Sequence, residues 1–254
     1  MKKTLFLLLT IAFCSASFGQ SIELSAEQRD NLYPSGEIVS RYHNDWTQRH
    51  YRDRIKVFKS EPLNFGDIVF IGNSITEKGR DWSEKFGTVE VRNRGIAGDL
   101  TDGVLKRMDE IVYFKPKAVF ILIGINDLFN LHHDMDGGRF KYDKIVPSPE
   151  YVGKNIEKIA REIHRKSPDT RIFVRTVLPT NRPFLKDDIL VVNEIIRTNE
   201  AKGNYKLIDL YAQFVDADGG LTNELTVDGV HLSEKGYEKW VAFEKPILEE
   251  LVGN

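Results

Sequence analysis

The sequence predicts an α/β fold with a parallel β-sheet covered by helices on both faces. Three observations predict it. Short apolar segments suited to buried parallel strands recur beyond residue 65. Segments with helical spacing of apolar residues lie between them, and such alternation specifies a parallel sheet joined by right-handed crossovers. No internal repeat and no linker rich in Pro, Gly or Ser divides the 254 residues, so one domain is expected.

The chain begins with the three parts of a secretory signal peptide. Lys2 and Lys3 supply the positive start, residues 5–13 are apolar apart from one threonine, and small residues at 15–19 offer a cleavage point before Gln20. The apolar stretch is too short to span a bilayer comfortably. We therefore expect residues 1–19 to be removed on export to the periplasm or the extracellular space, with no stable membrane insertion.

The single cysteine, Cys14, lies within this segment. A mature chain without cysteine excludes a disulfide scaffold and a cysteine-based zinc site, and it suits an oxidising compartment. A lipoprotein anchor on Cys14 is an alternative, but Phe13 stands where known lipoboxes have a small residue.

Composition and charge narrow the class of partner. The chain has 36 Lys+Arg against 38 Asp+Glu, and 41% of its residues are hydrophobic, as in folded globular proteins. Without a basic excess, electrostatic binding to nucleic acid or to an anionic membrane is not expected. The sequence gives no indication of the oligomeric state.

Residues 20–64 are predicted to form a helical extension packed on the core, ahead of a main domain at 65–254. Apolar residues recur there at helical spacing, which predicts one or two helices between residues 37 and 59. They are Ile38, Tyr42, Trp46, Ile55 and Phe58. The basic residues of the same segment indicate a solvated helix face.

The main domain alternates predicted strands and helices. The strands are expected at residues 67–71, 89–91, 118–123, 171–177 and 206–210. The helices are expected over the apolar faces at 104–112, 152–163 and 189–196, and from about 234 to 251. Ligands bind at the carboxyl ends of the strands in such sheets, so the residues after each strand are the candidate site.

Ser74 follows the first predicted strand, in Gly-Asn-Ser-Ile-Thr. A serine on a strand-to-helix turn has its hydroxyl above the sheet edge, and the amide N–H groups of the helix start point at whatever binds there. The alternative is that Ser74 or Thr76 merely caps the helix. The second glycine of the G-x-S-x-G elbow is absent.

The next two strands end in possible oxyanion donors. Gly95 and Gly98, in Asn-Arg-Gly-Ile-Ala-Gly-Asp, let the backbone approach a ligand closely. Asn126, in Gly-Ile-Asn-Asp, can direct its amide at a developing oxyanion. Each segment is equally compatible with an ordinary turn.

Asp228 and His231, in Asp-Gly-Val-His, precede the last predicted helix. An acid three residues before a histidine can accept Nδ1–H and leave Nε2 free as a base. Alone this pair is common as a cap or a surface contact. With Ser74, Gly98 and Asn126, it assembles the parts of a serine hydrolase site at one sheet edge.

At these residues the sequence resembles the SGNH hydrolases, also called the GDSL esterase/lipase superfamily, over residues 65–250. The second segment looks closest to the platelet-activating-factor acetylhydrolase-like branch. The resemblance implies a three-layer α/β/α sandwich with a flavodoxin-like parallel sheet of about five strands. Asn73 replaces the Asp of the family's Gly-Asp-Ser, and activity is expected to survive because that position neighbours the nucleophile.

The resemblance also implies roles for the matching residues. Ser74 would be the nucleophile, His231 the base and Asp228 the acid that orients it. Ser74 and Gly98 would supply backbone N–H groups to the oxyanion hole, and Asn126 its side-chain amide. No metal and no organic cofactor is needed for this chemistry.

The substrate contacts are predicted from long loops at the same edge. The segment from residue 126 to residue 148 is long and carries aromatic side chains, so it is expected to form a wall or lid. Asp127 and His132 within it, and Arg182 in the loop 179–184, are the predicted substrate contacts. His132 to Asp136 can also be read as metal ligands, but adjacent histidines do not easily aim at one ion.

We therefore expect a secreted serine esterase that acts on short acyl groups, with acetyl esters of carbohydrate as the leading substrate. The alternatives are a lipid or lysophospholipid acylhydrolase, and a non-catalytic glycan-binding protein on the same fold. The last alternative predicts damage to the Ser–His pair, whereas Ser74, Asp228 and His231 are all present.

Overall fold

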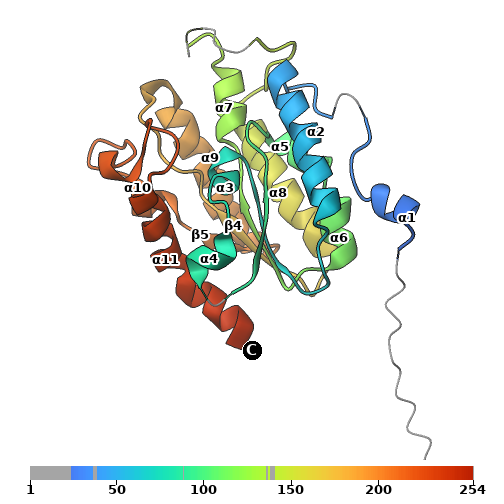
Figure 1. The fold of residues 1–254 in the computed structure, drawn as a ribbon. Helices are drawn as coiled ribbons and strands as arrows, with labels where there is room; N and C mark the ends of the chain where they lie inside the picture. The colour runs from blue at the N-terminus through green and yellow to red at the C-terminus, as the bar shows by residue number, and fades with distance from the viewer. Residues whose placement is uncertain (1–23, 37–38, 88, 136, 138–140, 254) are drawn as a thin grey trace, which may run out of the picture.

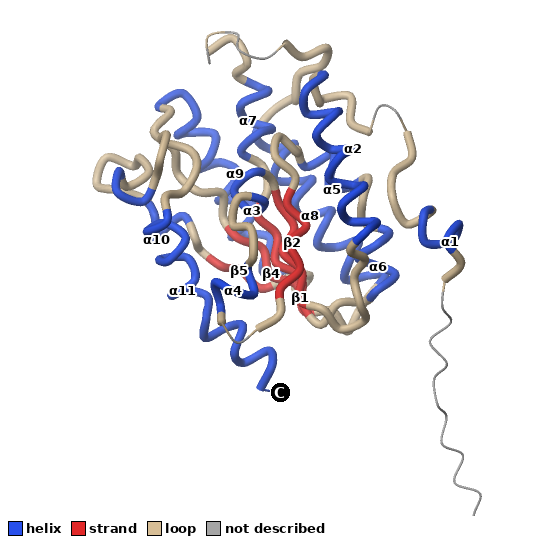
Figure 2. The backbone as a smooth tube through the Cα atoms, in the orientation of Figure 1, coloured by secondary structure: helices blue, strands red, loops and turns tan. Residues whose placement is uncertain are grey.

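A five-stranded, all-parallel sheet with strand order β2-β1-β3-β4-β5 forms the centre of the molecule (Figure 2). The computed structural model describes residues 24–36, 39–87, 89–135, 137 and 141–253, and the predicted signal peptide lies outside this part of the chain. The strands are β1 (Ile68–Gly72), β2 (Val91–Gly95), β3 (Ala118–Leu122), β4 (Arg171–Arg175) and β5 (Lys206–Ile208). The predicted α/β sandwich is confirmed.

Helices cover the sheet on both faces (Figure 1). One layer holds α5 (Thr101–Leu105), α6 (Asp109–Phe114), α8 (Pro149–Lys166) and α9 (Lys186–Asn199). The other holds α4 (Trp82–Phe86) and α11 (Glu234–Gly253). Short helices stand at the carboxyl edge: α3 (Ser74–Glu77), α7 (Ile125–Leu131) and α10 (Tyr211–Phe214). None of the helices in the described part of the chain is long and apolar enough to cross a membrane.

The segment before the first strand contains α1 (Ala26–Asp30) and α2 (Asp45–Ser60). α2 runs beside α5 and α6, with its start at the carboxyl edge of the sheet (Figures 1 and 2). Its apolar face is buried, and the Tyr51 hydroxyl donates to the carbonyl of Gly103 over 2.9 Å. The extension therefore packs directly against α5, the first helix after β2.

Two elements depart most from the prediction. The second strand was expected at residues 89–91 but runs over Val91–Gly95, because this edge strand carries polar side chains that pair outside the sheet, as Arg94 does with Glu110 at 2.7 Å. The helix expected over 104–112 is two short helices, α5 and α6. The helical backbone is interrupted between them, where the guanidinium of Arg107 donates a hydrogen bond to the carbonyl of Arg94.

A buried ion pair fastens β4 to α11. Arg175 and Glu244 are fully buried and make two hydrogen bonds of 2.8 and 2.7 Å. The guanidinium lies 4.1 Å from the ring centroid of Phe70 and 4.8 Å from that of Trp240. Because both charges are withdrawn from water, each depends on the other for compensation.

Candidate active site

Ser74 is the first residue of α3, directly after β1. The side chain of Asn73 caps this helix by accepting the N–H of Ile75 over 3.0 Å. Asparagine performs this capping as well as aspartate does, which explains how Asn73 can stand in the family's Asp position. A Cβ atom on Gly72 would collide with the Thr76 side chain, so only glycine permits the sharp turn that lifts Ser74 above the sheet.

The structure brings the three predicted triad residues into one hydrogen-bonded chain. His231 Nε2 lies 3.0 Å from Ser74 Oγ, across 157 positions of sequence. His231 Nδ1 lies 2.7 Å from Asp228 Oδ2. The other carboxylate oxygen of Asp228 accepts the backbone N–H groups of Val230 and His231, at 3.0 and 2.7 Å. The acid is thereby fixed toward the imidazole, as base orientation requires.

Electrostatics keep Asp228 ionised. Partial burial opposes ionisation, but hydrogen bonds from the His231 ring and from the N–H groups of His231 and Val230 outweigh it and lower the pKa of Asp228 from 3.8 to about 2. At neutral pH the carboxylate therefore stands ready to stabilise a positive charge on the imidazole.

Gly98 forms a left-handed turn after β2, with φ of 79°. A Cβ atom at this position would collide with the Thr47 methyl group and would lie 3.0 Å from the Trp46 ring. The same loop is tied to the first strand by the N–H of Ile96, which donates to the carbonyl of Gly72 over 3.0 Å. Both its conformation and its packing against α2 require glycine here.

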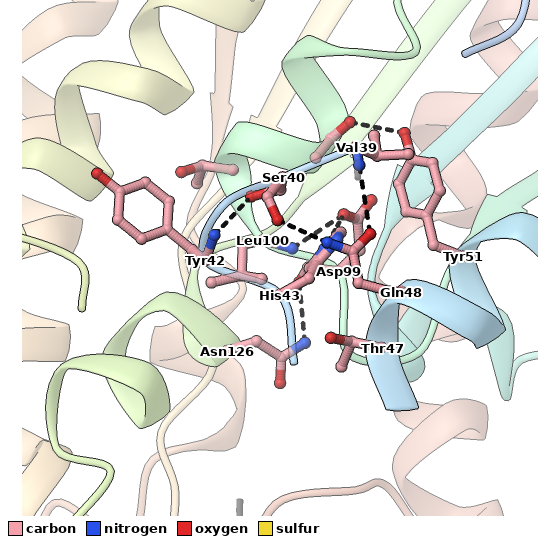
Figure 3. A network of polar contacts seen from close by, with 12 residues as sticks. Val39, Ser40, Tyr42, His43, Thr47, Gln48, Tyr51, Asp99, Leu100 and Asn126 are labelled. Carbon is pink, nitrogen blue, oxygen red and sulfur yellow. Dashed lines mark hydrogen bonds and ion pairs between the residues drawn. The ribbon is translucent and has the colours of Figure 1, made fainter. Parts of the chain in front are cut away.

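Asn126 reaches the Gly98 loop from α7. Its Nδ2 donates to the backbone carbonyl of Asp99 over 2.9 Å (Figure 3). Because the amide carries two hydrogens, the second can be donated to a ligand. The buried carboxylate of Asp99 lies 3.0 Å from Arg107 and 3.3 Å from His43 Nε2. These contacts hold the side chain of Asp99, whose backbone carbonyl orients Asn126.

The prediction that Asp127 contacts substrate is wrong, because its side chain points inward. Asp127 is only 1% exposed, and its carboxylate accepts the backbone N–H and the hydroxyl of Thr101, the hydroxyl at 2.6 Å. Burial raises the pKa of Asp127 to about 7, although the hydrogen bonds from Thr101 act against the rise. Neighbouring side chains of α7 point in different directions, so Asn126 meets the loop while Asp127 is enclosed.

His132 and Arg182 lie in loops at the same edge. His132 Nε2 pairs with Asp188 of α9 at 2.6 Å, and its ring packs edge-on against Phe184. A Cβ atom on Gly229, in the Asp228–His231 loop, would lie 3.0 Å from Arg182 Nη1. Their roles in substrate binding stay predictions. Among the described residues, no group of three or more His, Cys, Asp and Glu side chains is arranged to hold a metal ion.

The sequence analysis missed one polar link between α3 and the loop that contains Gly98. Glu77, three residues after Ser74, accepts the backbone N–H of Ala97 and lies 2.9 Å from Nε2 of His50 in α2. A glutamate one turn after the serine, in a helix of four residues, is the only signal in the sequence that pointed there. The link joins α2, α3 and the Gly98 loop.

A small apolar hollow is lined in part by sequence neighbours of the predicted site residues. It has an empty volume of about 240 Å³, its open mouth included. Ile75, Ile125 and Val230 in its wall are each the immediate sequence neighbour of a predicted triad or oxyanion residue. The remaining lining residues are Asn73, Leu122, Ile123, Val177, Leu178, Pro179 and Thr180.

Comparison with known sequences agrees with this geometry. The model of the GDSL-like Lipase/Acylhydrolase family matches residues 70–239. Platelet-activating factor acetylhydrolase IB subunit alpha2 of Rattus norvegicus is 28% identical over 202 residues, which cover 76% of this chain and 79% of that protein.

Solved structures share the fold. A structure from Streptococcus pneumonia described as a platelet activating factor has a TM-score of 0.66 and 26% identity, and covers 80% of this chain and 95% of its own. A catalytic mutant of an acetylxylan esterase from Geobacillus stearothermophilus has a TM-score of 0.58 and 20% identity, over 74% of this chain and 95% of its own.

Proposed function

We propose that this chain, which belongs to the GDSL-like lipase/acylhydrolase family and is an ester hydrolase, acts as a secreted serine esterase. The proposed reaction is the removal of acetyl groups from carbohydrate. The observation that carries the mechanism is the continuous hydrogen-bonded chain from Ser74 through His231 to Asp228, with distances of 3.0 and 2.7 Å. A hydroxyl, a base and a carboxylate in this order are the parts of a serine hydrolase triad.

In the first half of the proposed reaction, His231 Nε2 takes the proton of Ser74 Oγ as that oxygen attacks the ester carbonyl. Asp228 holds the imidazole by Nδ1 and stabilises its positive charge. The backbone N–H groups of Ser74 and Gly98 and the amide of Asn126 receive the negative charge that develops on the carbonyl oxygen.

In the second half, the tetrahedral intermediate expels the alcohol, which takes the proton from His231. The acyl group is then bonded to Ser74 Oγ. Water attacks this acyl-enzyme while His231 again accepts the proton, and the carboxylic acid leaves as Ser74 recovers its hydrogen. The balance of the cycle is ester plus water giving alcohol plus acid.

A small acyl group is supported by the apolar hollow, whose lining includes sequence neighbours of the predicted triad and oxyanion residues. The aliphatic side chains of Ile75, Ile125 and Val230 suit the methyl group of acetate. An acetyl group is also supported by the name of a relative, the platelet-activating factor acetylhydrolase IB subunit alpha2 of Rattus norvegicus.

The carbohydrate acceptor is supported by the predicted signal peptide. A signal peptide at residues 1–19 would deliver the enzyme to a compartment that contains acetylated glycans. That segment lies outside the described residues. The second candidate, an acetyl ester of a lipid alcohol, is favoured by the activity in the name of the Rattus norvegicus relative.

The test is hydrolysis of p-nitrophenyl acetate, butyrate, octanoate and palmitate by the wild type and by Ser74→Ala. We expect kcat/KM to be highest for acetate and the variant to be inactive. A maximum at long chains would move the assignment to a lipase. Equal rates in both proteins would exclude Ser74 as the nucleophile and favour a non-catalytic binding protein.

The acceptor is then tested by acetate release from acetylated xylo-oligosaccharides and from an acetylated phospholipid, compared at equal ester concentration. We expect a higher kcat/KM on the saccharide. A higher value on the lipid would establish the second candidate.

A further inference from the structure

Trp46 is the one tryptophan of the chain that reaches solvent. It is 45% exposed, whereas Trp82 and Trp240, the other two, are 0% exposed. Trp46 is the second residue of α2, and a Cβ atom built on Gly98 would lie 3.0 Å from its Cζ3. Since the N–H of Gly98 is a proposed oxyanion donor, an exposed indole stands at the rim of the proposed active site.

The indole is held in one orientation. It stacks on His50, one helical turn later, with ring centroids 5.2 Å apart and an interplanar angle of 5°. His50 Nε2 lies 2.9 and 3.1 Å from the two carboxylate oxygens of Glu77, which also accepts the N–H of Ala97. The stack occupies one face of the indole, while Trp46 stays 45% exposed to solvent. A contact fixed in advance loses little entropy when a ligand binds.

Trp46 is not needed to brace the Gly98 loop, because its neighbour does so. Thr47 is 6% exposed and its methyl group abuts Gly98, while its hydroxyl accepts the N–H of Asn44 in the cap of α2. Covering the apolar surface of the indole would stabilise the fold. An indole that is oriented and yet left uncovered is arranged as a ligand contact.

We propose that Trp46 is the subsite for the alcohol part of the ester, and that its open face stacks on the pyranose ring of an acetylated sugar. The assignment rests on the function proposed above and adds a specificity-determining residue to it. A pyranose offers C–H groups on its face and hydroxyls at its edge. The exposed polar residues Asp45 and Arg49 flank Trp46 on α2, so the edge meets polar groups. A quaternary ammonium alcohol is the other ligand class that tryptophan attracts.

The first test compares two acetyl esters that differ only in the alcohol. Monoacetylated methyl β-xylopyranoside offers a ring to the indole, and ethyl acetate does not. In Trp46→Ala we expect the ratio of kcat/KM for the sugar ester to kcat/KM for ethyl acetate to fall about tenfold, mainly through KM. Trp46→Phe keeps an aromatic face and should lose less of the ratio than Trp46→Leu, which keeps only apolar bulk.

Phe65→Ala is the matched control. Phe65 is 57% exposed and precedes β1, at the opposite edge of the sheet, so its removal should leave the ratio unchanged. An unchanged ratio in Trp46→Ala would refute the subsite. If Trp46→Ala lowered kcat/KM for acetylcholine more than kcat/KM for the sugar ester, the indole would be a binding site for a cation. That result would also overturn the proposal.

The second test needs no turnover. In Ser74→Ala only Trp46 among the tryptophans is exposed, so binding of monoacetylated methyl β-xylopyranoside should change the intrinsic fluorescence saturably. The change should be absent in Ser74→Ala/Trp46→Phe. Its absence in Ser74→Ala would refute the subsite even if the wild type hydrolyses acetate esters. Its presence with an inactive wild type would refute the proposed function alone.

Discussion

Replacing Asn126 with alanine is expected to lower kcat for p-nitrophenyl acetate about 10²–10³-fold, or roughly 3–4 kcal/mol, with little change in KM. The amide of Asn126 is oriented by a 2.9 Å bond to the carbonyl of Asp99, so its free hydrogen is in place before the oxyanion forms. The substitution removes that donor from the transition state, where the negative charge is largest. It also removes one hydrogen bond, which contributes about 1 kcal/mol to the free energy of unfolding.

Asn155→Ala is the control for the loss of stability. Its Nδ2 donates to the hydroxyl of Thr101 over 3.0 Å, behind the site, and not to the loop that contains Gly98. The two variants should have similar free energies of unfolding in urea, while only Asn126→Ala loses kcat by two orders of magnitude or more. A loss of kcat below tenfold in Asn126→Ala, or an equal loss in both, would refute the role of Asn126 as an oxyanion donor.

Three further substitutions test the packing and the charges around the site. Gly98→Ala should cost about 1–3 kcal/mol of unfolding free energy for the left-handed backbone and about 100-fold in kcat for displacement of the loop by Thr47; normal values of both would contradict the geometry. Glu244→Gln should cost about 3–5 kcal/mol in urea unfolding, because Arg175 stays buried without a counter-charge; a loss below about 1 kcal/mol would show that this charge is compensated elsewhere. Because the pKa of Asp127 rises from 3.8 to about 7 on folding, the folded state keeps a proton that the unfolded state releases, and stability should fall between about pH 4 and pH 7 by up to about 4 kcal/mol. Urea unfolding of Asp127→Asn should show a flatter dependence over this range, and an unchanged slope would refute the assignment.

The sequence was most informative where topology alone brings residues together. Ser74 and Asn126 each follow a strand of a parallel sheet, and such strands end at the same edge. His231 precedes the last helix, and the structure places it 3.0 Å from Ser74. The order of the strands along the chain was therefore enough to group Ser74 and Asn126 before any distance was known.

The sequence was least informative where polar side chains find partners far away. β2 carries Arg92, Asn93 and Arg94, which hide a strand from any search for apolar runs. Arg94 is 2% exposed only because Glu110 compensates its charge. Asp127 shows the same limit in reverse. An aspartate beside a predicted site residue suggests a ligand contact, and only the packing of Thr101 over it reveals that it is enclosed.

The helix α2 was predictable only in part. The spacing of its apolar residues predicts a buried face, but it does not predict which part of the protein that face covers. The covered surface includes the Gly98 loop, which Thr47 contacts directly. The family model begins at residue 70 and includes Ser74 and the other proposed catalytic groups. Thr47 and His43, which pack against the Gly98 loop and its neighbour Asp99, lie before residue 70. The chemistry is thus contained in the segment shared with the family, while the rim that would meet the alcohol of the ester is built in part by the preceding helix. Relatives that share the triad but differ in this helix should therefore cleave the same bond in esters of different alcohols.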